Sequence, residues 1–454
     1  MHHVNDSIFI PPVDDPAVKE LYSLLKQYIF QRKIVTVPKY IKYITPDSFS
    51  YSSSRAFEII QRLKGIKRYK IRDANLIINL FSDLFREKPK VTLEHMNILK
   101  IIVSNPLISY KDLAFKMKIS KPTAKRKFTE VSEWFKIHFA SFLNPFCIKM
   151  KRFFLYFVVE KDKVSILKNK IDTPFTMNIN TDVFTEIRGL ISGWAVFYIP
   201  NNKSVINKFK KFIISLYQKH IISYFDLYEQ KAITYGVNLD FYDGTNWYFD
   251  SLKMVYSFNF LKENYNLYSP PDFLYYKHCS FNFALKQKDL TLLFLLMNKA
   301  RMTLSEIRET MLRLGYDVTI QEISRKRKIF FNTALKPYAR LNNIGLTSSI
   351  LIILDFPEDE IDSLSNIISR FFGNFFPLYF MTLTNSGIIA FLEVPPDKLD
   401  ETVFRIKALL DGICDNIKII MRYYNIGSKG LLETVPFWNE RKQRWDVPKN
   451  LFLY

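Results

Sequence analysis

Residues 108–137 read ISYKDLAFKMKISKPTAKRKFTEVSEWFKI, and this stretch decides how the rest of the chain is interpreted. Tyr110–Met117 carries apolar residues at helical spacing, while Ser120 and Pro122 are typical of the start of a second helix. Upstream, Leu93–Ser104 predicts a further helix. The pattern therefore predicts a three-helix unit that contains a helix-turn-helix.

The second of these helices has the features of a DNA recognition helix. Its start is cationic and its later residues form an apolar face, so one end could reach phosphates and bases while the other packs on a scaffold. We expect Thr123, Lys125 and Arg126 to face bases, and Lys121 and Lys127 to contact phosphates. The alternative is a solvated, lysine-rich helix of an ordinary bundle.

Four pairs of adjacent residues within residues 93–127 match the motif of a known family. They are Ile108-Ser109, Leu113-Ala114, Ile119-Ser120 and Pro122-Thr123. At these places the chain resembles the winged helix-turn-helix of the Lrp/AsnC family of archaeal and bacterial transcription regulators. The resemblance implies DNA binding by this unit and a regulatory domain after it.

The residues that follow alternate between strands and helices. Residues 153–160 (FFLYFVVE) are an apolar run typical of a buried strand, and later segments complete a βαββαβ order. This order is ferredoxin-like. It resembles the regulatory domain that follows the winged helix in Lrp/AsnC proteins.

The second half of the chain repeats this plan. Matching features, such as Phe153 with Ser349 and Phe241 with Phe437, lie at a nearly constant offset. We therefore predict an α+β fold with tandem winged helix-turn-helix domains, each followed by a ferredoxin-like βαββαβ domain. The predicted divisions are a flexible arm (1–15), an N-terminal helical or winged-helix-like domain (16–90), winged helix-turn-helix 1 (91–148), ferredoxin-like domain 1 (149–250), a linker (251–287), winged helix-turn-helix 2 (288–344), ferredoxin-like domain 2 (345–430) and a C-terminal tail (431–454).

Two further groups of residues are predicted to contact DNA. One lies on a second recognition helix, and the other lies near the N-terminus, where two residues would open a third recognition helix and two would lie on a β wing. The alternative for the N-terminal group is a small helical cap with a solvated basic edge. The second helix carries Gln321, Ser324 and Arg325 toward bases, Lys326 and Arg327 toward phosphates, and Lys328 beside them; the N-terminal group is Ser53 and Arg55 on the helix with Lys67 and Arg68 on the wing.

The composition favours a polyanionic partner. The chain has 454 residues, a formal net charge of +21 and 48% hydrophobic residues, so it can bury a core while attracting nucleic acid. A membrane surface or ribosomal RNA would explain the same charge. No apolar run approaches the roughly 18 residues that span a bilayer, and the start lacks a leader. We therefore expect a cytoplasmic, nucleoid-associated protein.

Few residues suggest chemistry. The histidines show no metal-ligand spacing, and no phosphate-binding glycine loop or nucleophile motif is present. The cysteines, Cys147, Cys279 and Cys414, are far apart, so we expect reduced thiols. Acidic residues at 355–360 suit the start of a helix better than a catalytic pair. Trp247 and the corresponding Trp445 suit packing better than base stacking. We expect no enzyme activity, metal or cofactor.

These observations predict a sequence-specific double-stranded DNA-binding protein that regulates transcription through two or three winged helices. Its two copies could pair within one chain as a pseudo-dimer, or the chain could form a homodimer. Two alternatives stay open, a winged-helix initiator that binds replication origins and a scaffold that recruits the transcription machinery. A small-molecule effector also stays open as a further partner.

Overall fold

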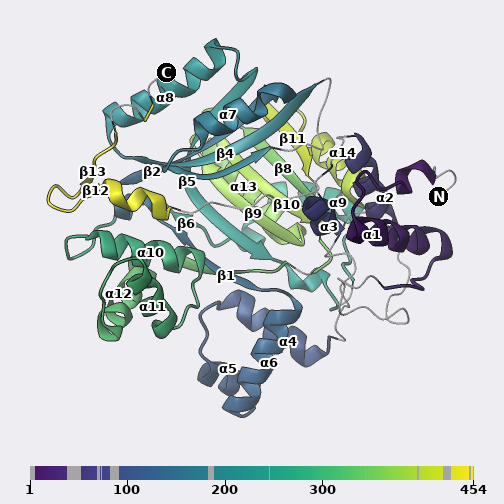
Figure 1. The fold of residues 1–454 in the computed structure, drawn as a ribbon, viewed down its shortest axis with the longest axis horizontal. Helices are drawn as coiled ribbons and strands as arrows, with labels where there is room; N and C mark the ends of the chain where they lie inside the picture. The colour runs from purple at the N-terminus through teal and green to yellow at the C-terminus, as the bar shows by residue number, and fades with distance from the viewer. Residues whose placement is uncertain are drawn as a thin grey trace.

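A nine-stranded antiparallel sheet organises the computed structural model of this protein, which has an α+β fold (Figure 1). The strands follow the order β11-β8-β10-β9-β5-β2-β4-β3, and β6 pairs with β5 beside this path. The structure describes residues 6–37, 53–68, 72, 74–81, 91–181, 189–244, 246–342, 344–346, 348–395, 398–422, 431–448 and 451–452.

The first half of the sheet has the βαββαβ order expected from the sequence. Its strand β2 is buried on both faces because alternate residues point to opposite sides. Phe153 contacts Phe209 of the covering helix, whereas Phe154 contacts Phe391 of the other half. The elements are β2 (Met150–Glu160), α7 (Val164–Ile171), β3 (Thr176–Thr181), β4 (Leu190–Pro200), α8 (Lys203–Gln218) and β5 (Tyr224–Val237).

The second half repeats the order of the first. Its helix α13 buries a broad apolar face against β9 and β10. The elements are β8 (Ser348–Asp355), α13 (Ile361–Phe375), β9 (Leu378–Thr384), β10 (Gly387–Val394), α14 (Leu399–Leu410) and β11 (Asn416–Arg422).

The long strand β5 joins the two halves into one sheet. Its first residues pair with β2, up to Glu229 opposite Phe153, and its later residues, from Gln230 to Val237, pair with β9. A register shift separates Gln230 from Ala232 on the β9 side. The strand therefore changes partner part-way along its length.

The two half-sheets also face one another across a shared core. Phe391 of β10 lies 5.1 Å, ring to ring, from Trp194 of β4 and 6.3 Å from Phe154 of β2. Tyr228 of β5 also donates a hydrogen bond of 3.1 Å to Asp355 of β8. This carboxylate also accepts bonds from a serine and an asparagine, so it has a structural place at the end of β8.

Two three-helix units lie side by side beneath the sheet in Figure 1. Their strands β1 and β7 form an antiparallel pair, from His138 opposite Arg340 to Leu143 opposite Leu335. Ser and Thr side chains cap five of the six helices, and Ser120 is among them, as predicted. The first unit is α4 (Leu93–Ser104), α5 (Tyr110–Met117), α6 (Lys121–Trp134) and β1 (His138–Leu143); the second is α10 (Gln287–Asn298), α11 (Leu304–Arg313), α12 (Ile320–Thr333) and β7 (Leu335–Arg340).

Matching contacts cross between the two halves of the chain in both directions. Next to each strand of the β1–β7 pair, a backbone amide of one half donates a hydrogen bond to a backbone carbonyl of the other half. Each half also ends in a tryptophan, and its indole N–H donates to a backbone carbonyl of the other half. These tryptophans pack within the protein, as expected. The bonds are Asn144 N to Ala334 O (2.8 Å), Asn342 N to Phe135 O (3.1 Å), Trp247 Nε1 to Ile344 O (2.5 Å) and Trp445 Nε1 to Ile148 O (2.6 Å).

The N-terminal helices form a separate apolar cluster. The arm predicted at residues 1–15 is structured in its described part, because Ile8 and Phe9 of the 3-10 helix Asp6–Phe9 are buried in this cluster. The helices are α1 (Pro16–Lys26), which continues as a π-helix (Gln27–Gln31), α2 (Ser53–Arg68) and α3 (Ala74–Phe81).

The segments predicted as linker and tail are also built into the fold. Helix α9 (Ser251–Asn264) packs on α13 and α14, and β6 (Leu274–Tyr275) pairs with β5. The tail contains a hairpin of β12 (Trp438–Asn439) and β13 (Arg444–Trp445), in which both tryptophans are buried. None of the described helices is long and apolar enough to cross a membrane.

The prediction of three reduced thiols is wrong for two of them. Cys147 and Cys279 form a disulfide, with 4.9 Å between their Cα atoms, and Cys414 is a free thiol. The disulfide joins the segment between β1 and β2 to the segment that follows β6. A separation of 132 residues hides this pairing from any local pattern.

Candidate functional sites: two helix faces and a central pocket

Helix α6 presents a basic face to solvent. Lys121, Lys125 and Arg126 are exposed, and the opposite side of the helix buries apolar residues against α4 and α5. Thr123 is half-buried and its hydroxyl lies 2.8 Å from the Ser120 hydroxyl that caps the helix. The spacing of the apolar residues produces this division, because residues three and four apart share one face of a helix. Four of the five predicted contact residues on α6 therefore lie on or beside its open face.

Lys127 is the exception on α6. Its amine pairs with the carboxylate of Glu94 on α4, and its side chain is only 16% exposed. The charge therefore links two helices of the unit. We predicted a phosphate contact for this lysine, whereas the structure places it in an ion pair inside the unit.

Helix α12 exposes a smaller part of its basic sequence. Gln321, Ser324, Arg325 and Lys328 are exposed, as a DNA-facing surface requires. Lys326 is instead buried, with its amine 3.1 Å from Asp289 of α10 and 3.3 Å from the centre of the Phe283 ring. Its position on the apolar side of the helix explains this, because Ile323 and Phe330 share that side.

Arg327 of α12 is also directed into the protein. Its guanidinium donates hydrogen bonds to Met302 O (2.9 Å) and Ala300 O (3.0 Å), which are carbonyls of the turn between α10 and α11. Burial is the main cause that lowers the pKa of Arg327, and the positive charge of Arg301 adds to it. Neither Lys326 nor Arg327 is thus placed as the predicted phosphate contact.

Arg301 links the two three-helix units, and the sequence analysis did not single it out. From the second unit it donates two hydrogen bonds of 2.9 Å to Pro106 O and Ile108 O in the first. Its guanidinium also lies over the Phe128 ring, 4.4 Å from the ring centre. Burial lowers the pKa of Arg301, with Tyr110 opposing the shift. No local pattern could reveal this contact, because nearly two hundred residues separate donor from acceptor.

The N-terminal candidates lie on a single helix. Ser53 and Arg55 fall in the first turn of α2, as predicted, but Lys67 and Arg68 form its last turn. The expected β wing is therefore wrong at these two residues. The Lys67 amine bonds to the Ser7 hydroxyl at 2.9 Å, which ties α2 to the first 3-10 helix.

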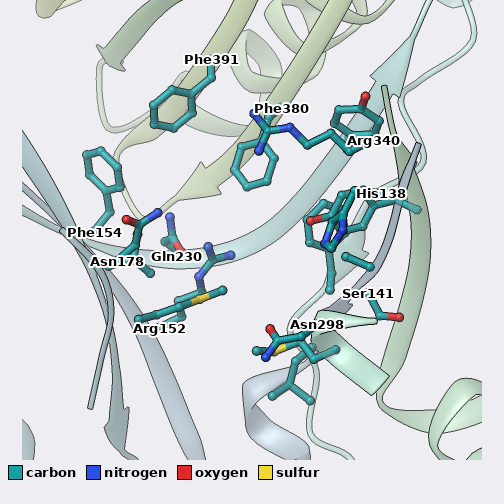
Figure 2. A pocket seen from close by; sticks show the side chains of 18 of the residues that line it. His138, Ser141, Arg152, Phe154, Asn178, Gln230, Asn298, Arg340, Phe380 and Phe391 are labelled. Atoms are coloured by element: carbon teal, nitrogen blue, oxygen red, sulfur yellow. The ribbon is translucent and has the colours of Figure 1, made fainter. Parts of the chain in front are cut away.

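A pocket of about 210 Å³ lies between the β1–β7 pair and the two half-sheets (Figure 2). Figure 2 shows Arg152 and Gln230 on one side of this pocket and Arg340 and His138 on the other. Partial burial lowers the pKa of His138, and the charges of Arg340 and Lys299 lower it further. These causes favour the neutral imidazole of His138, which can both donate and accept hydrogen bonds, while a backbone hydrogen bond with Asn298 opposes the shift.

Arg152 is the buried charge of this pocket. It donates a hydrogen bond of 2.9 Å to the Tyr276 hydroxyl and lies 5.6 Å from the centre of the Tyr198 ring. Among the described residues, no carboxylate forms an ion pair with it. A guanidinium keeps its charge inside a protein. The pocket therefore contains a buried cation whose described contacts are with tyrosines.

Comparisons with known proteins give distant similarities. No family model and no curated protein matches the sequence. Among solved structures, the siroheme decarboxylase NirDL is 14% identical with a TM-score of 0.41, covering 73% of this chain and 91% of that chain. Its complex with an iron-uroporphyrin III analogue is 13% identical with a TM-score of 0.43, again covering 73% of this chain and 91% of that chain. PH0061 is 13% identical with a TM-score of 0.23, covering 31% of this chain and 92% of that chain. We assign neither fold nor function from similarities at this level.

Proposed function

We propose that this protein is a sequence-specific double-stranded DNA-binding protein that regulates transcription. The observation that carries the proposal is the open face of α6. Lys121, Lys125 and Arg126 are exposed on it together, while the remainder of the helix is held by packing and by the Lys127–Glu94 pair. A recognition helix requires this combination, because its donors must project from a scaffold that does not move.

We further propose that the chain is a tandem duplication of a winged helix-turn-helix and a ferredoxin-like domain. The matching hydrogen bonds that cross between the halves support this, since each half gives the other an amide and an indole donor at corresponding places. The repeated βαββαβ order supports it as well. One chain would then present two helix faces, as a dimer of a shorter protein would.

The strength of binding should depend steeply on salt. Two basic faces on a chain of net charge +21 should displace counterions from several phosphates. For about 6 to 10 contacts, affinity should fall roughly a thousandfold or more between 50 and 200 mM salt. Fluorescence anisotropy with a labelled duplex measures this dependence.

Charge-matched variants separate the helix face from the general charge. The double variant Lys121→Ala, Lys125→Ala should reduce the slope of log affinity against log salt by roughly one to two, because Lys121 is the predicted phosphate contact and Lys125 adds a second one if it reaches a phosphate. Lys208→Ala with Lys210→Ala removes two exposed lysines of α8 and serves as the control. A flat salt response, or equal slopes for the two double variants, would contradict DNA binding through α6.

A further inference from the structure

The central pocket contains a buried charge that has no ion-pair partner among the described residues. Arg152 is buried, and Tyr276 is the partner that accepts its hydrogen bond. Removing a cation from water is costly unless an anion or several hydrogen bonds compensate for the loss. An anion in the pocket would supply this compensation.

Two polar atoms of the pocket point to the same conclusion. Arg152 Nε and Gln230 Oε1 are both buried, and neither has a hydrogen-bond partner among the described residues. Buried polar atoms are rarely left in this state. Figure 2 shows both side chains at the cavity, where one occupant could accept from the arginine and donate to the glutamine.

The walls of the pocket define the rest of the occupant. Phe154, Trp194, Phe380 and Phe391 supply apolar aromatic surface on the half-sheets. A cavity of about 150 Å³ holds a benzene molecule. The 210 Å³ measured here would therefore take one aromatic ring, or a fused pair, together with a small polar group.

The charge balance of the lining favours an anion. Arg152 and Arg340 carry positive charge, and Glu393 is the carboxylate that lines the pocket with them. Burial raises the pKa of Tyr235, and the negative charge of the nearby Glu393 raises it further. Two arginines against one carboxylate leave the lining positive overall.

We propose that this pocket binds a small aromatic carboxylate. Its carboxylate would accept hydrogen bonds from Arg152, its ring would lie against Phe154 and Phe391, and a hydroxyl or N–H group on the ring would donate to Gln230. This site is separate from the helix faces, so it does not depend on DNA binding.

Isothermal titration calorimetry of the full chain tests the proposal. The probes are benzoate, 4-hydroxybenzoate and indole-3-carboxylate, with benzamide and benzylamine as neutral and cationic analogues. At least one carboxylate should bind, and roughly tenfold or more tightly than benzamide, because a charged hydrogen bond is stronger than a neutral one. Binding by none of the carboxylates, or equal binding of benzoate and benzamide, would overturn the proposal.

Variants of the pocket place the binding site. Arg152→Met should abolish carboxylate binding and leave the melting temperature of the free protein equal or higher, because it removes a buried charge that lacks an acid partner. Arg405→Met, at an ion pair with Glu401 on α14, should leave binding unchanged. Unchanged binding by Arg152→Met would reject the site.

A second variant covers the case in which Arg152→Met does not fold. Phe391→Trp enlarges a side chain that lines the cavity from the second half-sheet. It should weaken carboxylate binding at least tenfold by occupying the space of the ring. Full affinity in this variant would equally reject the site.

Discussion

The two three-helix units use the same basic pattern in different ways. Counted from their N-caps, Ser120 and Thr319, Lys127 and Lys326 occupy the same place on α6 and α12. Each pairs with an acid near the start of the first helix in its own unit. A lysine at this place therefore joins two helices in both units. The position of a cation on the helix, rather than its presence in a basic run, therefore decides whether its charge is exposed to solvent.

The two units differ in which arginine donates hydrogen bonds to the backbone carbonyls of the turn after their first helix. In the second unit, Arg327 of α12 bonds to Ala300 O and Met302 O. In the first unit, the residue at the place of Arg327 is Phe128, and Arg301 of the second unit bonds to the corresponding turn. The second unit thus stabilises its own turn, whereas the first depends on its neighbour.

The largest expected effect comes from breaking the buried ion pair of the second unit. In the Lys326–Asp289 pair the side chains are 10% and 4% exposed. Lys326→Ala would leave Asp289 buried without its cation, which should cost about 3 to 5 kcal/mol of stability. Lys127→Ala is the matched control, and its more exposed pair should cost about 1 kcal/mol or less. Urea unfolding of both variants measures the difference, and equal losses would show that burial does not distinguish the pairs.

A smaller effect should follow from removing the link between the units. Arg301→Ala deletes two charged hydrogen bonds, and we expect a loss of about 2 to 3 kcal/mol. Hydrogen exchange should rise across residues 106–117 of the first unit. Arg327→Ala should instead raise exchange across residues 300–313 of its own unit. If Arg301→Ala raises hydrogen exchange only in the second unit, then the first unit does not depend on its neighbour for this turn.

Local patterns predicted the parts of the fold that local forces determine. The cap at Ser120 and the repeated βαββαβ order follow from capping and from the spacing of apolar residues. Contacts between residues far apart in the sequence could not be predicted from these patterns. The Cys147–Cys279 disulfide depends on two segments meeting in space, which no single element records.

The candidate sites show the same division. The exposed part of α6 was predicted because amphipathic spacing separates its two faces. The inward direction of Lys326 was not predicted, although its spacing from Ile323 and Phe330 places it on the apolar side of the helix, and its partner Asp289 lies on another helix. The pocket at Arg152 gave no sequence signal, since its lining comes from β1, both half-sheets and β7.

Single substitutions on the exposed faces should separate base readout from phosphate contact. Arg126→Ala should cost roughly 1 to 3 kcal/mol mainly on the specific site. Lys125→Ala, if this lysine reaches a phosphate instead of a base, should weaken specific and random duplexes alike. Lys127→Ala should change DNA affinity less than either, because its amine already pairs with Glu94. A loss for Lys127→Ala as large as for Lys125→Ala would show that the ion pair opens on DNA.

The smallest effects, and the sharpest comparison, concern the two halves of the DNA site. Counted from the N-caps, Arg126 and Arg325 occupy the same place and are both exposed, whereas Lys125 corresponds to Ser324. Arginine at such a place most often binds guanine through two hydrogen bonds. We therefore predict that the two half-sites share one guanine and differ at the neighbouring bases, so that the site is not a palindrome. Selection from random duplexes, repeated with Arg325→Ala, measures this: the variant should lose the preference for guanine in one half-site only. Enrichment of a perfect inverted repeat, with both halves affected equally by Arg325→Ala, would show that the two helices read the same sequence despite their different side chains.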